Sequence, residues 1–497
     1  MLEKLKKNLN YRIVCFLLLS FNLFTICRLL HDKIGIFTKS GFFLIFGSVI
    51  LEIIFLLLIS RLEKTRIEKK FLYLFLIIGF MYLFAFPINQ TPDEGAHVFR
   101  AYEVSLGHLS STVNDRNQVG RDLPSGVAKV LGNDNYKKVG ANLKIKSNSK
   151  REFVTFDNTS LYSFICYIPQ AIGIFISRLI TNKVLIQLYV GRIFNFLCFT
   201  LLYYFAIKIL PTKKEFLFFM AFLPITIQEA ISLAPDCLTI SASVFLFSYV
   251  MYLRQNKNKI NKRQLCLLSL ICIIISQCKI VYLPICLLVF LLPKEKFKSK
   301  KMKYITIFTI AGLVIVLNLA WLYVASSFLQ ISSSGKSANQ INYILSNPLR
   351  YLFVCGDTFY QSFQTWLYQS LGNYLGWFNI FVPDIYILGN LFIFLSIIFS
   401  YDKNICLGYR DNLLLFFIYF CTVALIFTSL YVQWTAYKAS SISGIQGRYF
   451  QPIMLLLPFL FSNINFKIQK NVLERYFYSF LILENVMVLF IIVIHYL

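Results

Sequence analysis

Charged residues are scarce in this sequence, and acids are the scarcer kind. Of its 497 residues 14% are charged, with 23 acids against 49 lysines and arginines. Soluble domains have about a quarter of their residues charged, so this composition excludes an ordinary soluble protein. The sequence also lacks a Walker A loop, a dinucleotide-binding glycine fingerprint and an H-E-x-x-H zinc motif. It therefore gives no sign of a nucleotide-binding enzyme or a zinc protease of those kinds.

Cysteine pairing is also absent. The twelve cysteines fall almost wholly in apolar runs, none are spaced C-x-x-C, and residues 89–160 contain none. Cysteines in such surroundings behave as small hydrophobic side chains. We therefore expect neither disulfides nor a metal–thiolate site.

Long apolar runs are what the sequence has instead. It is 57% hydrophobic, and stretches of about 20 apolar residues, enough to cross a bilayer, recur along it. The runs cover residues 11–30, 41–60, 71–88, 161–180, 185–210, 216–233, 237–253, 265–292, 304–328, 380–400, 413–432, 449–461 and 477–497. This pattern predicts an all-α polytopic membrane protein with about 11–13 transmembrane helices.

Basic residues crowd the short loops between these runs, chiefly at residues 4–12, 61–70, 254–263 and 294–303. Such groups mark the cytoplasmic side, and anionic lipid head groups are their expected neighbours. The net charge of +26 therefore does not indicate nucleic-acid binding. The N-terminus is then cytoplasmic, residues 89–160 form a large extracytoplasmic loop after the third span, and the C-terminus is extracytoplasmic.

Two stretches resist a simple count of spans. An odd number of crossings must separate the external residues 89–160 from the basic loop 254–263, yet four apolar runs lie between them. Either one run between residues 161 and 233 does not cross fully, or the hydropathy interpretation fails there. Residues 265–292 have basic loops at both ends and Lys279 in the middle, which favours a hairpin of two half-length helices.

The spans and loops divide the chain into five parts. We expect N-terminal spans over residues 1–88 and an extracytoplasmic loop with an interfacial helix over 89–160. A central transmembrane module follows over 161–328. A second extracytoplasmic loop with interfacial helices, 329–379, then leads to C-terminal spans over 380–497.

The stretch "QTPDEGAHVFRAYEVSLG" sets charged side chains directly after an apolar run. Its simplest interpretation is a helix start, with Thr91 as the cap and Glu94 completing a capping box. Helical spacing places Asp93, His97 and Arg100 on one polar stripe. Ionisable residues at a membrane interface are functional candidates, so we predict a site on this stripe.

Further candidates stand beside other apolar runs. Asp236, in "SLAPDCLTISAS", has no basic neighbour within fifteen residues and is either a helix cap or a second acid of the site. Arg448 and Tyr449, in "ISGIQGRYFQP", open a run where a cation opposes the helix dipole. Arg448 is either an anchor to head groups or the ligand of a specific lipid phosphate, which a guanidinium binds bidentately.

These motifs resemble an uncharacterised group of membrane proteins, domain-of-unknown-function family 2142. Residues 92–107, "PDEGAHVFRAYEVSLG", are similar to its first-loop signature, P-D-E-x-x-H-x-x-R-A followed by a glycine. Gly95 departs from it, because the family commonly has proline there. "LAPDCLTISAS", "CKIVYLPICLLVFLLP" and "GIQGRYFQP" are similar to its later motifs and occur in the expected order. The resemblance spans about residues 71–463, and the family in turn resembles the GT-C superfamily of glycosyltransferases.

The GT-C resemblance implies a reaction. A sugar on a polyprenyl phosphate would pass, with inversion, to an extracytoplasmic acceptor such as a cell-surface polysaccharide or a lipid-linked glycan. Asp93 would act as general base, and Arg448, ahead of Lys279, would stabilise the leaving phosphate. The candidate catalytic residues are Asp93, Glu94 and Asp236, and the candidate substrate-binding residues are His97, Arg100, Lys279, Arg448 and Tyr449.

Two other classes stay open. A transporter or flippase for a lipid-linked sugar would favour mid-span charges and inverted repeats, and Arg192 and Lys279 are present but no repeat is. A polysaccharide polymerase or ligase would more typically carry its large external loop late in the chain. The sequence identifies neither sugar nor acceptor, and it does not require a divalent cation, although three scattered acids could hold one. Abundant lysine, isoleucine and asparagine point to an AT-rich bacterium, and hence to its plasma membrane.

Overall fold

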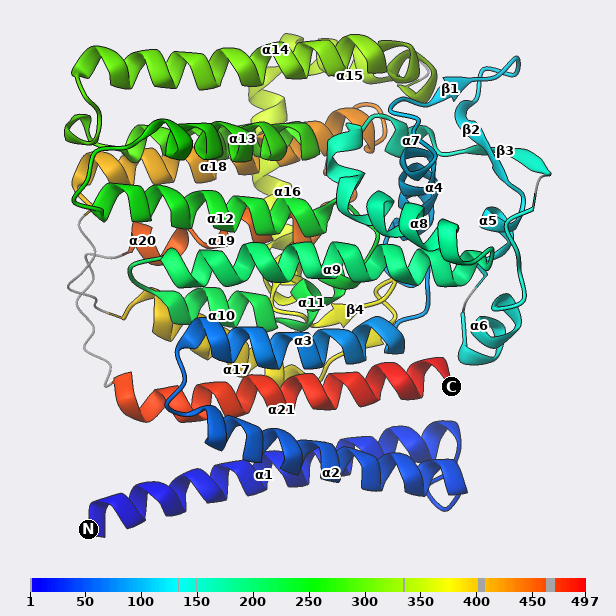
Figure 1. Cartoon of the computed structure of the whole chain (residues 1–497), viewed down its shortest axis with the longest axis vertical. Helices are drawn as coiled ribbons and strands as arrows, with labels where there is room; N and C mark the ends of the chain where they lie inside the picture. The colour runs from blue at the N-terminus through cyan, green and yellow to red at the C-terminus, as the bar shows by residue number, and fades with distance from the viewer. Residues whose placement is uncertain (1, 133, 149, 334–335, 401–406, 462–469) are drawn as a thin grey trace.

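The computed structural model describes residues 2–132, 134–148, 150–333, 336–400, 407–461 and 470–497. Helices dominate, and most run along one common direction (Figure 1). In these ranges β-structure is confined to five short strands and isolated bridges. The prediction of an all-α polytopic membrane protein is confirmed.

Seven helices of the described residues are long and apolar enough to cross a membrane. In three of them, α1 (Leu2–Lys33), α2 (Lys39–Leu62) and α14 (Lys300–Ser333), only 22% of the most apolar stretch is buried inside the protein, which leaves most of each helix to face lipid. Three shorter apolar helical stretches, residues 164–180, 280–291 and 384–398, accompany them. The seven are α1 (Leu2–Lys33), α2 (Lys39–Leu62), α9 (Val184–Ile209), α12 (Asp236–Gln255), α14 (Lys300–Ser333), α18 (Tyr409–Gln433) and α21 (Lys470–Tyr496).

The short helix α8 (Ile168–Ile180) resolves the parity of the spans. Tyr167, just before it, hydrogen-bonds His97 at 2.7 Å. Asn182, just after it, accepts a hydrogen bond from the backbone N–H of Ser147 at 2.7 Å. Both partners belong to residues 89–160, so α8 starts and ends on the same side of the bundle.

Three crossings then remain between residues 89–160 and the basic loop 254–263. They are α9, the broken pair α10 (Lys214–Phe222) and α11 (Pro224–Ile231), and α12. The two segments lie at opposite ends of the bundle in Figure 1, as an odd number of crossings requires. The run 161–180 is the one that does not cross.

The hairpin expected around Lys279 is present, but its first helix has 17 residues and is not half-length. Helix α13 (Lys262–Cys278) is followed by the 3-10 helix η2 (Ile280–Leu291), and Lys279 lies between them in an extended conformation. The N–H of Ile260 donates to the carbonyl of Lys296 at 2.8 Å, so the basic loops at the two ends of the hairpin meet. Lys279 is thereby held at the opposite end from these loops.

Residues 89–160 form a small folded lobe, at the right of Figure 1. Its sheet has the antiparallel order β1-β2-β3, and β2 and β3 pair in the register Gly120↔Thr155. Val98, Tyr102, Leu123 and Phe156 form its buried core. The elements are α4 (Glu94–Ser105), β1 (Thr112–Val113), β2 (Val119–Pro124), α5 (Gly126–Lys129), α6 (Tyr136–Asn142), β3 (Arg151–Thr155) and α7 (Asp157–Ser160).

The C-terminal third is more broken than its apolar runs predict. Residues 449–461, expected to be a span, contain only short helical pieces, and α16 crosses the main helix direction steeply (Figure 1). The elements of this part are α15 (Lys336–Ser346), α16 (Pro348–Ser370), β4 (Tyr374–Leu375), β5 (Ile380–Phe381), α17 (Asp384–Ile398), η4 (Gly447–Phe450), α19 (Gln451–Met454) and α20 (Leu457–Leu460). Two short 3-10 helices lie earlier in the chain, η1 (Phe164–Tyr167) and η3 (Lys294–Lys296).

Aromatic side chains pack the centre of the bundle. The ring of Phe75, on α3 (Ile67–Ala85), lies 4.9 Å from that of Phe71 and 5.5 Å from that of Phe196 on α9, between centroids. It also meets Phe199 at 5.6 Å and Phe222 of α10 at 5.5 Å. Rings at these separations attract one another beyond the burial of their area, so they hold α3, α9 and α10 firmly together.

Close packing of α8 on α9 depends on two glycines. A Cβ on Gly173 would meet the carbonyl oxygen of Val190 at 2.7 Å, and one on Gly191 would meet the side chain of Ile174 at 2.8 Å. We expect Gly173→Val to destabilise the purified protein by about 1–3 kcal/mol, because overpacking forces backbone shifts. Thermal unfolding in detergent measures this. Gly312→Val is the control, since a Cβ there meets nothing within 4 Å, and equal melting temperatures for the two variants would contradict the close packing.

Candidate functional site

The predicted capping box at the start of α4 is wrong. The N-cap is Asp93, not Thr91, and it makes no side-chain cap hydrogen bond. The Thr91 hydroxyl is buried without a hydrogen-bond partner in the described structure. Asp93 has φ +64°, a left-handed conformation that is uncommon outside glycine and recurs at functional sites. The Asp93 carboxylate is therefore not consumed in capping.

Glu94 forms a buried ion pair with Arg192 of α9. Its carboxylate accepts hydrogen bonds from Arg192 Nε at 2.8 Å and Nη2 at 2.5 Å, and both side chains are fully buried. It also accepts from the backbone N–H groups of Asn89 at 2.8 Å and Leu233 at 3.1 Å. Glu94 thus ties the start of α4 to α9 and to the turn before α12. The sequence concealed this role because Arg192 is 98 residues away.

Asp93 faces a different partner, Arg448 of η4. Arg448 Nη2 donates to Asp93 Oδ2 at 2.6 Å, and Nη1 lies 3.5 Å from Glu229 Oε1 and 3.9 Å from Asp236 Oδ2. Lys279 Nζ donates to Asp236 Oδ1 at 2.5 Å. We call Asp93, Glu229, Asp236, Lys279 and Arg448 the charge cluster. The structure thus brings together four of the predicted acids and cations: Asp93, Asp236, Lys279 and Arg448.

The cluster is mostly buried. The Arg448 side chain is 4% exposed and that of Asp236 is 7% exposed, whereas the Asp93 side chain is 50% exposed. Asp93 is therefore the carboxylate that a molecule from solution meets first. Helix α16 holds η4 in place, because Gln369 Oε1 accepts from the N–H of Gly447 and Ser370 Oγ donates to its carbonyl, each at 2.9 Å.

Glu229 belongs to this cluster but was missed from the sequence. It lies on α11 and is fully buried, and neither carboxylate oxygen has a hydrogen-bond partner in the described structure. An acid inside the apolar run 216–233 was the available signal, since buried acids are rare without a partner. Because Asp93 is half-exposed, the two buried acids, Glu229 and Asp236, are matched by two cations, Arg448 and Lys279.

A cavity of about 320 Å³ opens beside Lys279, between α13, η2, α14 and α18. Tyr162, Trp321 and Tyr449 are among the residues that line it. Lys279 Nζ lies 5.3 Å from the centroid of the Tyr449 ring and 5.9 Å from that of Tyr162, at cation–π distance. Arg448 does not line this cavity among the residues described. The structure therefore sets Lys279, rather than Arg448, on the cavity wall.

His97 lies one turn after Asp93 and is buried. Its Nδ1 is 2.7 Å from the Tyr167 hydroxyl. Burial lowers the pKa of His97 to about 3, with Asp236 and Asp93 opposing the shift and Lys279 adding to it. The imidazole is therefore neutral at physiological pH and adds no charge beside the cluster.

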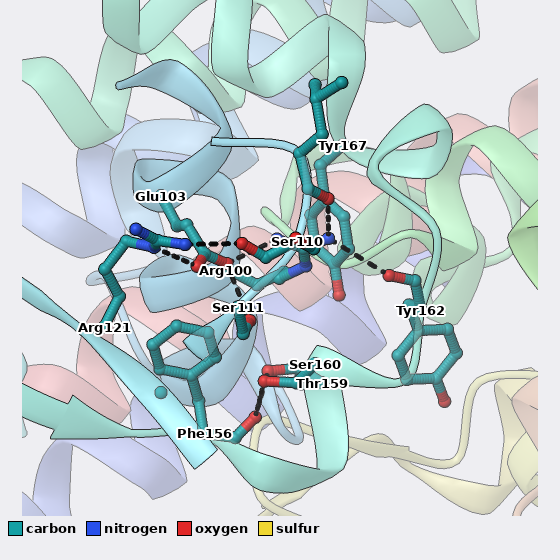
Figure 2. A network of polar contacts seen from close by, with 12 residues as sticks. Arg100, Glu103, Ser110, Ser111, Arg121, Phe156, Thr159, Ser160, Tyr162 and Tyr167 are labelled. Carbon is teal, nitrogen blue, oxygen red and sulfur yellow. Dashed lines mark hydrogen bonds and ion pairs between the residues drawn. The ribbon is translucent and has the colours of Figure 1, made fainter. Parts of the chain in front are cut away.

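Arg100 does not join Asp93, contrary to the predicted polar stripe. Its guanidinium pairs with Glu103 and donates to the carbonyls of Leu109 at 2.7 Å and Tyr162 at 3.4 Å. Figure 2 shows this network, in which Arg121 Nε also donates to Glu103 at 2.6 Å. Arg100 therefore braces the lobe, because a buried acid three residues later captures it. No group of three or more potential metal ligands occurs among the described residues.

The buried ion pair of Glu94 with Arg192 predicts a larger effect of replacing Glu94 than a helix-capping role would. Glu94→Gln leaves the Arg192 guanidinium buried without a counter-charge, so we expect it to destabilise the protein by about 3–5 kcal/mol. Thermal unfolding of the purified protein measures the loss. Asp134→Asn is the control, because Asp134 pairs with Lys138 on the exposed surface. A Glu94→Gln variant with the same melting temperature as the wild type would contradict a contribution of the Glu94–Arg192 pair to stability.

The depressed pKa of His97 predicts a loss of stability in acid. The pKa of His97 is about 3 in the folded protein against the ordinary 6.5. The contribution of the neutral imidazole to the stability of the fold is therefore complete above pH 6.5 and is lost as the pH falls towards 3. At pH 5 we expect about 2 kcal/mol to be lost, at 1.36 kcal/mol for each unit between the two values. His97→Gln should lose this part of the acid sensitivity. Melting temperatures at pH 7.5 and pH 5 measure it, and identical pH profiles for variant and wild type would contradict it.

Comparison with known families gives one match. The model of a family described as "Predicted membrane protein (DUF2142)" matches residues 74–457. This range contains the whole charge cluster. No curated protein and no solved structure matches the chain.

Proposed function

The chain belongs to the DUF2142 family of predicted membrane proteins, and on that premise we propose that it is a membrane glycosyltransferase. It would move a sugar from a polyprenyl-phosphate donor to an acceptor on the extracytoplasmic side, with inversion at the anomeric carbon. The observation that carries the proposal is one continuous arrangement. The half-exposed Asp93 binds Arg448, which faces Asp236, which in turn binds Lys279 on the wall of a cavity between helices.

The donor phosphate is assigned to Lys279. An ammonium has three donors, and only one of those on Lys279 is committed to a carboxylate, Asp236, in the described structure. Its cavity is bounded by α14, most of which faces lipid, so an isoprenoid chain can reach it from the bilayer. From the sequence, Arg448 was expected to bind the phosphate ahead of Lys279, and this assignment reverses that order. Arg448 instead keeps Asp93 in position.

Asp93 is assigned the role of general base. The acceptor oxygen attacks the anomeric carbon while its proton passes to the Asp93 carboxylate, and the bond from that carbon to the phosphate oxygen breaks. The leaving polyprenyl phosphate keeps the bonding electrons, and Lys279 stabilises its charge. Neutral His97, bonded to Tyr167, packs behind Asp93 without competing for the proton. The tertiary contacts of Glu94 and Arg100 remove both from the chemistry.

The first test replaces the proposed base. Asp93→Asn is nearly isosteric and keeps a group that Arg448 can bind, so the protein should fold while transfer falls by about 10²–10⁴-fold. Purified protein in nanodiscs, given a labelled polyprenyl-phosphate sugar and membrane glycans, reports the released polyprenyl phosphate. Asp134→Asn is the control and should be unchanged. Near wild-type turnover in Asp93→Asn would contradict the role of Asp93 as general base. A donor that crosses the bilayer uncleaved would indicate a flippase.

The second test separates the two cations. We expect Lys279→Met to weaken polyprenyl-phosphate binding by about tenfold to a hundredfold, as for the loss of a charged hydrogen bond. Arg448→Lys should keep donor binding and lower turnover, because lysine cannot bridge Asp93 and Asp236 with a planar fork. Native mass spectrometry with a polyprenyl phosphate measures binding. Lys301→Met, at an exposed position near the basic loops, is the control, and unchanged binding in Lys279→Met would remove Lys279 from the donor site.

A further inference from the structure

Two buried acids lie in transmembrane helices outside the charge cluster. Glu52, on α2, is 1% exposed and Glu484, on α21, is fully buried. Neither forms an ion pair with any residue that the structure describes. An isolated ionised carboxylate is very unfavourable in such surroundings, and ionisable residues inside a membrane are functional candidates by default.

Glu52 is bonded through an asparagine whose orientation is fixed. Asn22 of α1 donates from Nδ2 to Glu52 Oε1 at 2.6 Å. The Tyr386 hydroxyl of α17 donates to Asn22 Oδ1, and the backbone carbonyl on the other side of the amide can only accept, so it requires the amide nitrogen there. Asn22 Nδ2 also reaches the carbonyl of Leu483 at 3.4 Å. The acid on α2 is thus linked through α1 to α17 and α21.

Glu484 is also hydrogen-bonded to an asparagine, but one oxygen of each group has no hydrogen-bond partner in the described structure. Asn390 Nδ2 donates to Glu484 Oε1 at 2.7 Å. The other oxygens of the two groups, Glu484 Oε2 and Asn390 Oδ1, are buried and have no hydrogen-bond partner in the described structure. Both are acceptors as long as the acid is ionised. A proton on Oε2 turns one of them into a donor, so that a carboxylic acid can pair with the amide through two hydrogen bonds.

One face of α17 connects the two acids. Tyr386 and Asn390 are four residues apart and therefore lie on the same side of the helix. The titratable side chains that face the pair are Tyr386 itself and Tyr82 of α3, which bonds Asn485, the neighbour of Glu484, at 3.0 Å. No lysine, arginine or histidine of the described ranges is paired with either acid. Two protons are the simplest source of neutrality.

We propose that Glu52 and Glu484 form an intramembrane proton-binding site, each carrying one proton at neutral pH. The site lies where α1, α2 and α21 meet α17. The family match covers α17 but ends before α21 and begins after α2. The two protons therefore lie where α17, inside the matched range, meets helices outside that range. This inference does not depend on the glycosyltransferase proposal.

Infrared spectroscopy of the full-length protein tests the proposal. The C=O stretch of a protonated carboxylic acid is resolved from the carboxylate bands, and acids of ordinary pKa are ionised at pH 7. Glu52→Gln and Glu484→Gln should each remove part of the protonated band at pH 7, and the double variant should remove both parts. Glutamine imitates a neutral acid, so melting temperatures should stay close to that of the wild type.

Matched variants keep the result interpretable. Asp134→Asn alters an ion-paired acid on the exposed surface and should leave the protonated band unchanged. Asn390→Leu keeps Glu484 but removes its partner, so it should shift the band without abolishing it even where a glutamine variant folds poorly. The two-proton site would be overturned if the glutamine variants lost only carboxylate bands. It would also be overturned if only one of them lost part of the protonated band. So would a sodium- or potassium-dependent rise in melting temperature that the glutamine variants lack, which would indicate a bound cation.

Discussion

The Arg448 guanidinium is the interaction on which the site depends. It contacts acids from three separate places in the chain: Asp93 before α4, Glu229 on α11 and Asp236 at the start of α12. Without this guanidinium, the buried acids Glu229 and Asp236 would have only Lys279 to balance their charge, which would destabilise the protein strongly. The lobe, the broken helix α10–α11 and η4 are therefore held in one arrangement by a single planar group.

Two adjacent acids illustrate how burial divides roles. Asp93 has a half-exposed side chain, and Glu94 is fully buried against Arg192. The left-handed backbone at Asp93 separates the two carboxylates, so that one faces the cluster and the other ties α4 to α9. An acid that carries several hydrogen bonds from fixed donors provides rigidity. An acid with one partner and access to water remains available for chemistry.

The membrane shapes the rest of the architecture through the same requirement of satisfied polar groups. Irregular backbone is tolerated at membrane depth where it is buried in protein or lines a cavity. The turn at Lys279 and the short pieces over residues 447–460 meet this condition, because Lys279 lines the cavity and η4 packs on α16. Asn22 and Asn390 likewise donate to the buried acids Glu52 and Glu484, and Asn485 donates to the carbonyl of Phe222.

Composition and periodicity by themselves determined that the chain is a polytopic helical membrane protein. They also favoured a hairpin around Lys279 and showed that the four apolar runs between residues 161 and 253 conflict with the loop charges, without deciding whether one run fails to cross. These properties follow from local hydrophobicity and loop charge, which act over a few residues. Partner choice over long sequence distances followed from the fold alone: Glu94 with Arg192, Glu229 with Arg448, and Lys279 on the cavity wall. Such pairings depend on which side chains meet in a dry interior, and a linear sequence carries no distance between residues 98 or 219 positions apart.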